Sequence, residues 1–396
     1  MFPTDVVIVS GMRTPMVRYT GSFSEVSAID LGAHAAKATI QKSGVPPEEF
    51  DHVVFGNVLQ TSADAIYGAR HVGLKAGLKI ETPAVTVNRL CGSGIEAMVQ
   101  ASQRLLLGEA TMVLAGGMEN MTQAPFVIRG ARTGLKLGGG ALEDFLFVGL
   151  TDSYCSMPMA LTAEKLAEQK GVTRMDADEY ALRSQQAADT AAKAGFFQCE
   201  VSPVEVRQGR KTILVSEDDH RRPETTLETL QKLPPSFKKD GMVTAGNASG
   251  IVDGAAAVVV TRERTARERG LKPMGRIVSW AVAGVDPTIM GIGPVPASRR
   301  ALQLAGLTLS QMDRIEVNEA FAAQYLAVEK ELGLPREKTN VNGGAIALGH
   351  PLGASGTRLV ITVLNELRRK GLRYGLATAC IGGGQGIAMI VEALNN

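Results

Sequence analysis

The sequence predicts an α/β fold made of two similar halves and an inserted loop domain. Short β-rich runs alternate with helix-like runs, the pattern near residue 50 recurs near residue 310, and residues 120–246 interrupt that rhythm. Alternating strands and helices are typical of an α/β layer, so we expect a mainly parallel sheet. A chain of 396 residues is long enough for two domains or one large two-lobed unit.

The first elements follow the order strand, helix, strand. Residues 6–9 are a short β-rich run, and residues 30–43 form an Ala-rich, helix-like run that Gly44 ends, with two prolines just beyond it. Residues 50–59 return to a strand. Further strands are predicted at residues 84–87, 112–115, 255–260 and 374–379.

Two segments of the chain share one order of features. Gly44 corresponds to Gly306 and Asp51 to Asp313, and each pair is separated by the same 262 positions. In both copies a Val-Asn pair, a Gly-rich helix start, a helix-like run and a strand then follow. We infer an internal duplication of two α/β halves. Chance similarity is the alternative, because few residues are identical.

This organisation predicts three parts. The N-terminal half comprises residues 1–119 and 247–270, the inserted loop domain residues 120–246, and the C-terminal half residues 271–396. Long insertions in α/β proteins often cover a ligand site. We therefore expect the loop domain to lie over the functional site.

Composition and charge exclude several classes of protein. The net charge of +2 gives no reason to expect nucleic acid or a membrane surface as a partner. No apolar run approaches the ~18 residues of a membrane-spanning helix, and residues 1–10 lack the basic start of a signal peptide. The four cysteines form neither a disulfide framework nor a CxxC metal pair. We expect no metal, no membrane insertion and a reducing compartment.

Cys91 is the first candidate catalytic residue. It opens the motif Cys-Gly-Ser-Gly at residues 91–94, between a predicted strand and a predicted helix. The backbone N–H groups and the dipole at a helix start favour a thiolate. The small residues that follow allow an acyl chain to approach the backbone. The alternative is a buried structural cysteine, which is the common role of an isolated cysteine.

His350 lies at the centre of a Gly-rich loop, residues 342–356, where Gly349 and Pro351 flank it. It is a candidate base for Cys91, because an unperturbed cysteine pKa of ~8.5 leaves only a few per cent thiolate at neutral pH. The alternative is a loop histidine that hydrogen-bonds to backbone carbonyl groups.

Two further candidates also lie at strand ends. Cys380 follows a predicted strand and precedes the glycine run 382–384, which is where α/β sheets place their chemistry. That run resembles a phosphate cradle but lacks the Gly-Lys-Ser/Thr of a Walker motif. Asn318 stands at a strand-to-helix junction and is a candidate for holding a water or an oxyanion. Its alternative role is that of a helix N-cap.

Together, these four elements in this order resemble the thiolase superfamily over essentially the whole chain. The Gly-His-Pro loop and the terminal Cys-x-Gly motif make the resemblance specific. Residues 222–227, 230–235 and 289–296 resemble the degradative, mitochondrial-type 3-ketoacyl-CoA thiolases. The resemblance implies a five-layered α/β/α/β/α architecture with an inserted loop domain.

The resemblance also implies catalytic roles. Cys91 would accept the acyl group as a thioester, His350 would activate Cys91, and Cys380 would act as general acid and base at the α-carbon. Asn318, through a water, and His350 would line one oxyanion hole. The backbone N–H groups of Cys91 and Gly382 would line the second, and one preorganised oxyanion donor is worth roughly 3–4 kcal/mol.

CoA and acyl-CoA are the implied substrates, and no separate cofactor is implied. Family positions that contact CoA correspond here to Arg222, Thr225 and Ser249. Positions that line the pantetheine tunnel correspond to Met159, Phe237, Met290 and Phe321. Acetoacetyl-CoA-specific relatives have a histidine where this chain has Pro158, so we favour the broader 3-ketoacyl type.

The implied reaction is cleavage of 3-ketoacyl-CoA to acetyl-CoA and a shortened acyl-CoA, reversible by Claisen condensation, as in fatty acid β-oxidation. One alternative is an acetyl-CoA C-acetyltransferase specific for acetoacetyl-CoA. A ketoacyl synthase and a non-catalytic CoA or lipid carrier are disfavoured, because Cys380 and the other catalytic positions are intact. The resemblance further implies a homodimer or homotetramer, cytoplasmic in a bacterium or in the mitochondrial matrix of a eukaryote.

Overall fold

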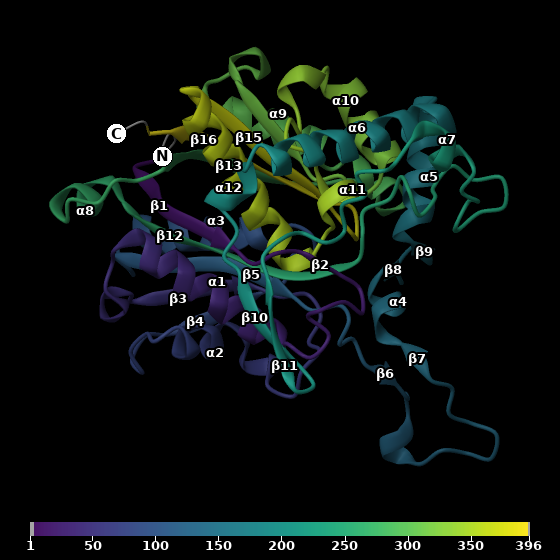
Figure 1. Cartoon of the computed structure of the whole chain (residues 1–396), viewed down its shortest axis with the longest axis horizontal. Helices are drawn as coiled ribbons and strands as arrows, with labels where there is room; N and C mark the ends of the chain where they lie inside the picture. The colour runs from purple at the N-terminus through teal and green to yellow at the C-terminus, as the bar shows by residue number, and fades with distance from the viewer. Residues whose placement is uncertain (1–3, 395–396) are drawn as a thin grey trace.

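A ten-stranded mixed sheet runs through the computed structural model, which describes residues 4–394 (Figure 1). Its strand order is β14, β15, β16, β13, β1, β12, β5, β3, β4, and β2 pairs with β12 outside this path. The strands are β1 (Val6–Arg13), β2 (Val17–Arg18), β3 (His52–Gly56), β4 (Ala84–Val87), β5 (Met112–Glu119), β12 (Val252–Arg262), β13 (Gly275–Gly284), β14 (Arg314–Val317), β15 (Tyr374–Ile381) and β16 (Gln385–Ala393). The strand expected at residues 50–59 is therefore shorter than predicted.

The strand pairing corrects one prediction. Only the outer strands pair in parallel, β3 with β4 and β5, and β14 with β15. The central strands are antiparallel, and β1 joins the two halves by pairing with β12 on one side and β13 on the other. The prediction of a mainly parallel sheet is wrong. One reason is that a short turn joins β15 to β16, and such a turn connects only antiparallel strands.

Helices cover both faces of the sheet and also fill the space between its two halves. Along β12, Val258 and Val260 face a central core, whereas Val259 faces an outer one, as the period-two alternation of a strand requires. The helices are α1 (Ala28–Ser43) and α2 (Gly68–Lys75) on the outer side of the N-terminal half, α9 (Pro294–Ala305) and α10 (Ala322–Leu332) on that of the C-terminal half, and α3 (Ser93–Leu107) with α12 (Leu352–Lys370) in the centre. This arrangement confirms the five layers.

The duplication seen in the sequence is present in the structure. Gly44 and Gly306 end α1 and α9 in the left-handed conformation, with φ of 72° and 67°. Asp51 accepts hydrogen bonds from backbone N–H groups at the start of β5, and Asp313 accepts them from N–H groups at the start of β15. The same short sequence signals therefore build the same corner in each half.

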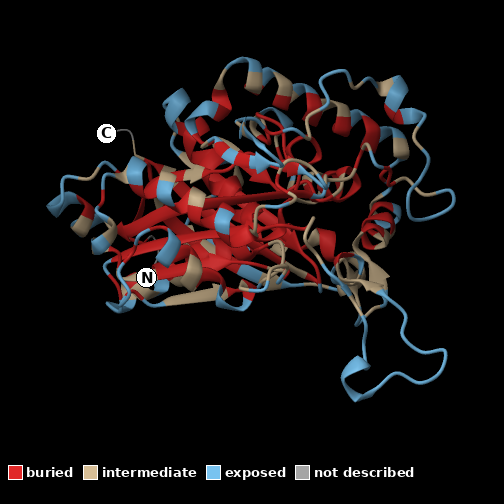
Figure 2. Cartoon of the chain, turned by 60° about the horizontal axis from the view of Figure 1, so that its bottom comes forward, coloured by how far each residue is buried: buried red, intermediate tan, exposed pale blue. Residues whose placement is uncertain are grey.

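The segment between β5 and β12 adds no strand to the central sheet. The helix-like run at 162–193 is two helices, because Gly171 (φ 65°) ends the first and a Thr173 capping box begins the second. Residues 128–142 form an arm that is exposed throughout (Figure 2). The segment holds α4 (Phe145–Gly149), α5 (Met159–Lys170), α6 (Arg174–Lys193), α7 (Leu227–Gln231), and the strands β6 (Phe126–Val127), β7 (Glu143–Asp144), β8 (Thr151–Asp152), β9 (Met157–Pro158), β10 (Val204–Gln208) and β11 (Lys211–Val215).

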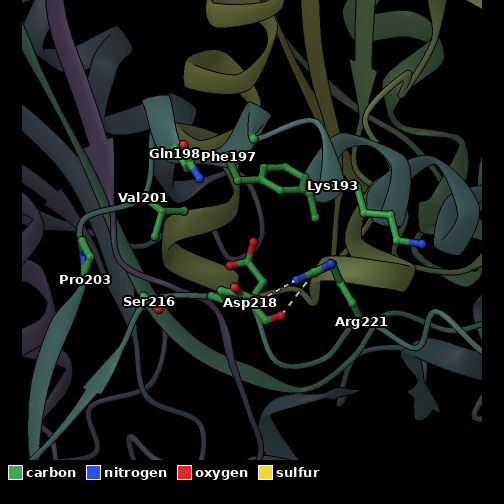
Figure 3. A pocket seen from close by; sticks show the side chains of 11 residues that line it. Lys193, Phe197, Gln198, Val201, Pro203, Ser216, Asp218 and Arg221 are labelled. Carbon is green, nitrogen blue, oxygen red and sulfur yellow. Dashed lines mark hydrogen bonds and ion pairs between the residues drawn. The ribbon is translucent and has the colours of Figure 1, made fainter.

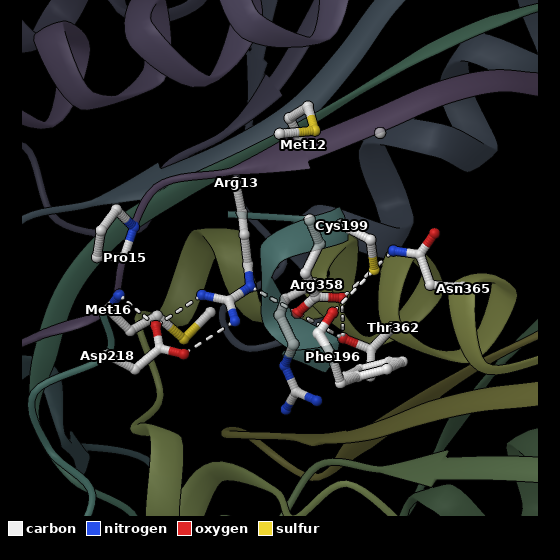
Figure 4. Close-up of polar contacts among 12 residues, drawn as sticks. Met12, Arg13, Pro15, Met16, Phe196, Cys199, Asp218, Arg358, Thr362 and Asn365 are labelled. Carbon is white, nitrogen blue, oxygen red and sulfur yellow. Dashed lines mark hydrogen bonds and ion pairs between the residues drawn. The ribbon is translucent and has the colours of Figure 1, made fainter. Parts of the chain in front are cut away.

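A buried ionic cluster joins this segment to both halves (Figure 4). Arg13 of β1 contacts Glu200 at 2.8 Å and Asp218 at 2.7 Å, and solvent reaches almost none of the three side chains. Glu200 also accepts a hydrogen bond of 3.1 Å from Thr362 of α12. Removing one partner of such a pair costs about 3–5 kcal/mol. The cluster therefore fixes the inserted segment against both halves.

Two short helices complete the fold, α8 (Glu263–Glu268) and α11 (Ala345–Leu348). Across residues 4–394, no helix is long and apolar enough to cross a membrane. Within the same range, no three histidine, cysteine, aspartate or glutamate side chains come together as metal ligands.

Candidate active site

Most of the predicted site residues surround one cavity of about 490 Å³. Its walls come from the loops at the sheet ends of both halves and from the inserted segment. The predicted residues that line it are Cys91, Met159, Phe237, Ser249, Met290, Phe321, His350 and Gly382. Sequence positions almost 300 residues apart therefore meet at one site.

Cys91 lies on a tight turn between β4 and α3. Leu90, just before it, has a positive φ of 45°, which is uncommon for a residue with a side chain. The side chain of Asn88 accepts a hydrogen bond of 2.9 Å from the N–H of Leu90 and thereby supports this turn. The first residue of α3 is Ser93, so Cys91 precedes the helix by two positions.

The surroundings of Cys91 determine its charge state. Burial raises the pKa of the Cys91 thiol to about 11, although a hydrogen bond from the backbone N–H of Gly382 acts in the opposite direction. The nearby carboxyl of Glu119 raises the pKa further. Burial therefore outweighs the effect of the backbone N–H groups, which favours a thiolate. Cys91 is a thiol at neutral pH and requires a base.

His350 lies between α11 and α12 in one defined orientation. Its backbone N–H donates to the carbonyl of Gly250 at 2.9 Å, and its Nδ1 lies 2.5 Å from Oγ of Ser355. The Ser355 hydroxyl donates its own hydrogen to the carbonyl of Pro351 at 2.9 Å. Ser355 Oγ must therefore accept from Nδ1–H, which leaves the lone pair on Nε2.

The charge state of His350 follows from its surroundings. Burial lowers the pKa of His350 to about 3, and the positive charge of Arg358 acts in the same direction. The imidazole is thus neutral at physiological pH. A neutral imidazole whose Nε2 carries no proton is the form that can accept one.

Asn318 is placed beside His350 by the end of β14. Its Nδ2 lies 3.3 Å from His350 Nε2, and its Oδ1 has no hydrogen-bond partner among the residues that the structure describes. The helix that follows begins at Ala322 with Phe321 as its N-cap. The N-cap alternative for Asn318 is therefore wrong, and among the described residues its buried Oδ1 is left without a partner close to His350.

Cys380 lies near the end of β15 and is fully buried. It packs against Met290 and Ala320, which both line the cavity. Burial raises its pKa, and the proximity of Cys91 raises it further. Cys380 is therefore a protonated thiol next to the first cysteine, which is the form of a proton donor.

The glycine run after Cys380 is a turn between β15 and β16 rather than a phosphate cradle. Gly383 and Gly384 have φ of 78° and 79°, values that favour glycine. A Cβ at Gly384 would lie 2.4 Å from the carbonyl oxygen of Val285. This turn sets the backbone N–H of Gly382 towards Cys91.

Four predicted residues are not among those that line the cavity. Asn318 and Cys380 are buried beside lining residues, and the other two are Arg222 and Thr225. Arg222 is exposed and Thr225 is half-buried, and the Thr225 hydroxyl donates to the carbonyl of Arg222 at 2.8 Å. The neighbouring His220 ring packs on Gly250 of the cavity wall. Contacts of Arg222 and Thr225 with CoA remain a prediction.

The structure adds residues that the sequence did not single out. Ser355 orients His350. The one feature of the sequence that could have indicated this role is its position, one helical turn into α12 and just after the Gly-His-Pro motif. Apolar side chains of the inserted segment extend the lining, and their signal is the run at residues 145–148. They include Met121, Leu146, Phe147 and Leu150, and Tyr19 of the N-terminal half joins them.

A second hollow, of about 510 Å³, lies at the end of α6 (Figure 3). Its lining includes Lys193, Gln198, Asp218 and Arg221, and it contains none of the predicted site residues. Asp218 is already held by Arg13, at 2.7 Å. The first cavity is therefore the candidate active site.

Comparison with known proteins agrees with this geometry. The family description "Thiolase, N-terminal domain" matches residues 6–264, and "Thiolase, C-terminal domain" matches residues 271–393. The chain belongs to the thiolase family of acyltransferases. The predictions of family, fold and enzyme class are thereby confirmed.

Two relatives are similar to this chain over almost its whole length. The chain is 54% identical to the mitochondrial 3-ketoacyl-CoA thiolase of Homo sapiens over 391 residues, which are 98% of both proteins. It is 49% identical to the acetyl-CoA acetyltransferase of Escherichia coli K12 over 98% of this chain and 99% of that protein.

Solved structures of two related enzymes superpose closely on this chain. The human mitochondrial 3-ketoacyl-CoA thiolase superposes with a TM-score of 0.96 over 98% of both chains, and a second structure of it contains CoA. The acetyl-CoA acetyltransferase of Bacillus anthracis superposes with a TM-score of 0.97 at 42% identity, over 99% of this chain and 100% of that one.

Proposed function

We propose that this enzyme transfers an acyl group from 3-ketoacyl-CoA to CoA, with Cys91 as the covalent carrier. The observation that supports this best is that Cys91 and a neutral His350, whose Nε2 carries no proton, line the same cavity. Asn318 and Cys380 lie directly beside them. Similarity to proteins named 3-ketoacyl-CoA thiolase points to the same substrate class.

In the proposed first half-reaction, His350 Nε2 takes the proton of Cys91 as its sulfur attacks the 3-keto carbon. The negative charge on the former keto oxygen is held by one oxyanion hole. The bond between C2 and C3 then breaks, and Cys380 gives its proton to C2 of the departing enolate. The products are acetyl-CoA and an acyl thioester on Cys91.

In the second half-reaction, Cys380 takes the proton of the incoming CoA thiol. The CoA sulfur attacks the acyl carbon, and the tetrahedral intermediate expels Cys91. The Cys91 sulfur regains its proton from His350, so every proton returns to its starting place. Asn318 with a water, His350, and the N–H groups of Cys91 and Gly382 stabilise the oxyanions of the two steps.

The cavity favours 3-ketoacyl chains longer than acetoacetyl. Pro158 lines it, where a histidine would supply a polar side chain, and Leu146, Phe147 and Leu150 add apolar surface. Burial of each CH₂ contributes about 0.8 kcal/mol, so such a wall stabilises an acyl tail. An acetoacetyl-CoA-specific enzyme is the second candidate, since acetyl-CoA acetyltransferases are also close relatives.

We also propose a homodimer or homotetramer, in the bacterial cytoplasm or the mitochondrial matrix. Two exposed features support association. The edge strand β4 is hydrogen-bonded through Thr86 to Ala69, which closely follows the exposed Ile66 and Tyr67 in the chain, and the arm 128–142 carries exposed leucines. We also propose that residues 120–246 form the inserted loop domain, and that residues 1–119 with 247–270 form the N-terminal half.

The test is acylation of Cys91. Mixing the wild-type protein with acetyl-CoA should add one acetyl group, seen as one mass increment by intact-mass spectrometry, whereas Cys91→Ala should show none. CoA-dependent cleavage of 3-ketoacyl-CoAs from C4 to C16 then gives the chain-length preference, with kcat/KM rising beyond C4. Equal acetylation of the variant would exclude Cys91 as the carrier.

A further inference from the structure

A turn that carries two lysines lies beside the substrate cavity. Residues 235–240 line a separate hollow of about 390 Å³. Ser236 and Phe237 belong both to this hollow and to the lining of the main cavity. Lys238 and Lys239 line only the outer one. The two hollows are therefore neighbours, and a ligand that leaves the cavity past Phe237 meets these lysines.

The backbone holds this turn in one conformation. Ser236 N–H donates to the carbonyl of Val243 at 2.9 Å, which closes the turn at its base. The buried carboxylate of Glu164 on α5 accepts from the N–H groups of Met242 and Val243, both at 2.8 Å. Gly241 packs on the same carboxylate, where a Cβ would lie 2.5 Å from Oε1. The lysines thus project from an anchored support.

The two ammonium groups are available to a ligand. Both side chains are exposed, and within residues 4–394 neither has an ion-pair partner. Asp240 lines the same hollow and offsets one of the two charges. By contrast, the exposed Lys232 nearby in the sequence is paired with Glu228 at 2.6 Å. The turn therefore presents unpaired positive charge next to the cavity.

We propose that Lys238 and Lys239 bind phosphate groups of the nucleotide part of CoA. This inference rests on the proposed function. When the thiol end of CoA reaches Cys91, its nucleotide end stays outside the cavity. The ammonium group of lysine binds phosphate as a point charge at the end of a flexible side chain. The turn then distinguishes CoA thioesters from thioesters of bare pantetheine, which carry no phosphate. Lys238 and Lys239 are specificity determinants and take no part in bond breaking.

The experiment compares CoA with pantetheine as the thiol that accepts the acyl group from Cys91. In Lys238→Gln/Lys239→Gln, the KM for CoA should rise about two- to thirtyfold with kcat unchanged, because two exposed charge contacts with phosphate are lost. The KM for pantetheine should stay at its wild-type value. Raising the salt concentration should weaken CoA use in the wild type more than in the variant.

The matched control removes the same charge elsewhere. Lys211→Gln/Lys232→Gln changes exposed lysines on β11 and just after α7, and its KM for CoA should equal that of the wild type. An unchanged KM for CoA in the Lys238/Lys239 variant, or an equal rise for both thiols, would overturn the proposal. The acetylation of wild-type Cys91 tests the proposed function separately, because it does not depend on these lysines.

Discussion

Before substrate binds, Cys91 is a neutral thiol and His350 is a neutral imidazole, so the two residues do not form an ion pair. Burial raises the pKa of Cys91 to about 11 and lowers that of His350 to about 3. A thiolate beside an imidazolium is therefore a minor state before substrate binds. We infer that the proton moves to Nε2 as the sulfur attacks the carbonyl carbon. Ser355 supports this transfer, because it fixes the tautomer whose Nε2 can accept.

Cys380 provides a residue-scale prediction. Cys380→Ala should still form the acetyl thioester on Cys91, but exchange of the α-protons of acetyl-CoA with D₂O should fall at least about 10²-fold, since the general acid and base is lost. Deuterium uptake is measured by mass spectrometry of acetyl-CoA. Cys199→Ala, at an exposed position, is the matched control. Equal exchange in both variants would remove Cys380 from its proposed role.

The sequence predicted the site residues unevenly. Cys91, His350 and Gly382 belong to motifs in which glycines force a particular backbone, and the structure brings all three to one cavity. Ser355 contributes because the geometry of the helix places its hydroxyl beside His350. No local sequence pattern predicts this contact. The charge state of Cys91 depends on burial by distant segments, which outweighs the local effect of the backbone N–H groups.

At the scale of elements, close glycine contacts set how the central helices approach the sheet. A Cβ on Gly117 of β5 would lie 1.8 Å from the carbonyl oxygen of Gly353 on α12. A Cβ on Gly94 of α3 would lie 2.4 Å from the backbone nitrogen of Thr357 on α12. Glycine at these positions therefore lets α12, which carries Ser355, lie directly on β5 and α3.

Gly117→Ala tests this contact. The methyl group cannot fit beside a backbone carbonyl, so the free energy of unfolding should fall by about 3 kcal/mol. Urea unfolding followed by circular dichroism gives the value. Gly284→Ala on β13, where an added Cβ meets nothing within 4 Å, should change it by less than about 0.5 kcal/mol. Equal effects of the two substitutions would show that the contact does not matter.

Local signals predicted the elements better than their pairing. Gly44, Gly306 and the two aspartates of the repeat mark corners that form as expected, because capping and turn chemistry act within a few residues. The antiparallel pairing of β1 with β13 joins residues more than 260 positions apart. No periodicity within either strand encodes that partner, so the direction of the central strands was not predictable.

At the scale of the molecule, buried carboxylates tie the halves together. Glu119 at the end of β5 accepts hydrogen bonds from the N–H groups of Val58 and Leu59, at 3.1 and 2.9 Å, and from that of Gly353 on α12 at 2.8 Å. One side chain thus joins the N-terminal half to the helix that carries Ser355. Burial nevertheless raises its pKa to about 7, against these hydrogen bonds.

The raised pKa of Glu119 makes the stability of the whole fold depend on pH. Between its unfolded value of 4.5 and its folded value of about 7, the folded protein holds a proton that the unfolded chain has released. The contribution of Glu119 to stability is therefore fully present below pH 4.5 and is lost as pH rises through 7. Glu119→Gln has no such titration. The free energy of unfolding of the wild type minus that of the variant should fall by about 3 kcal/mol across this range.

Urea unfolding from pH 4.5 to 8 at one protein concentration measures that difference, since association also contributes to apparent stability. Glu48→Gln, at an exposed position, is the control for loss of a carboxylate alone. A constant difference between the wild type and Glu119→Gln would mean that the three backbone donors and the Asn57 side chain, which also donates to Glu119 at 3.0 Å, offset its burial completely. A difference that increased with pH would mean that they lower its pKa, and that this junction stabilises the two halves most strongly when Glu119 is ionised.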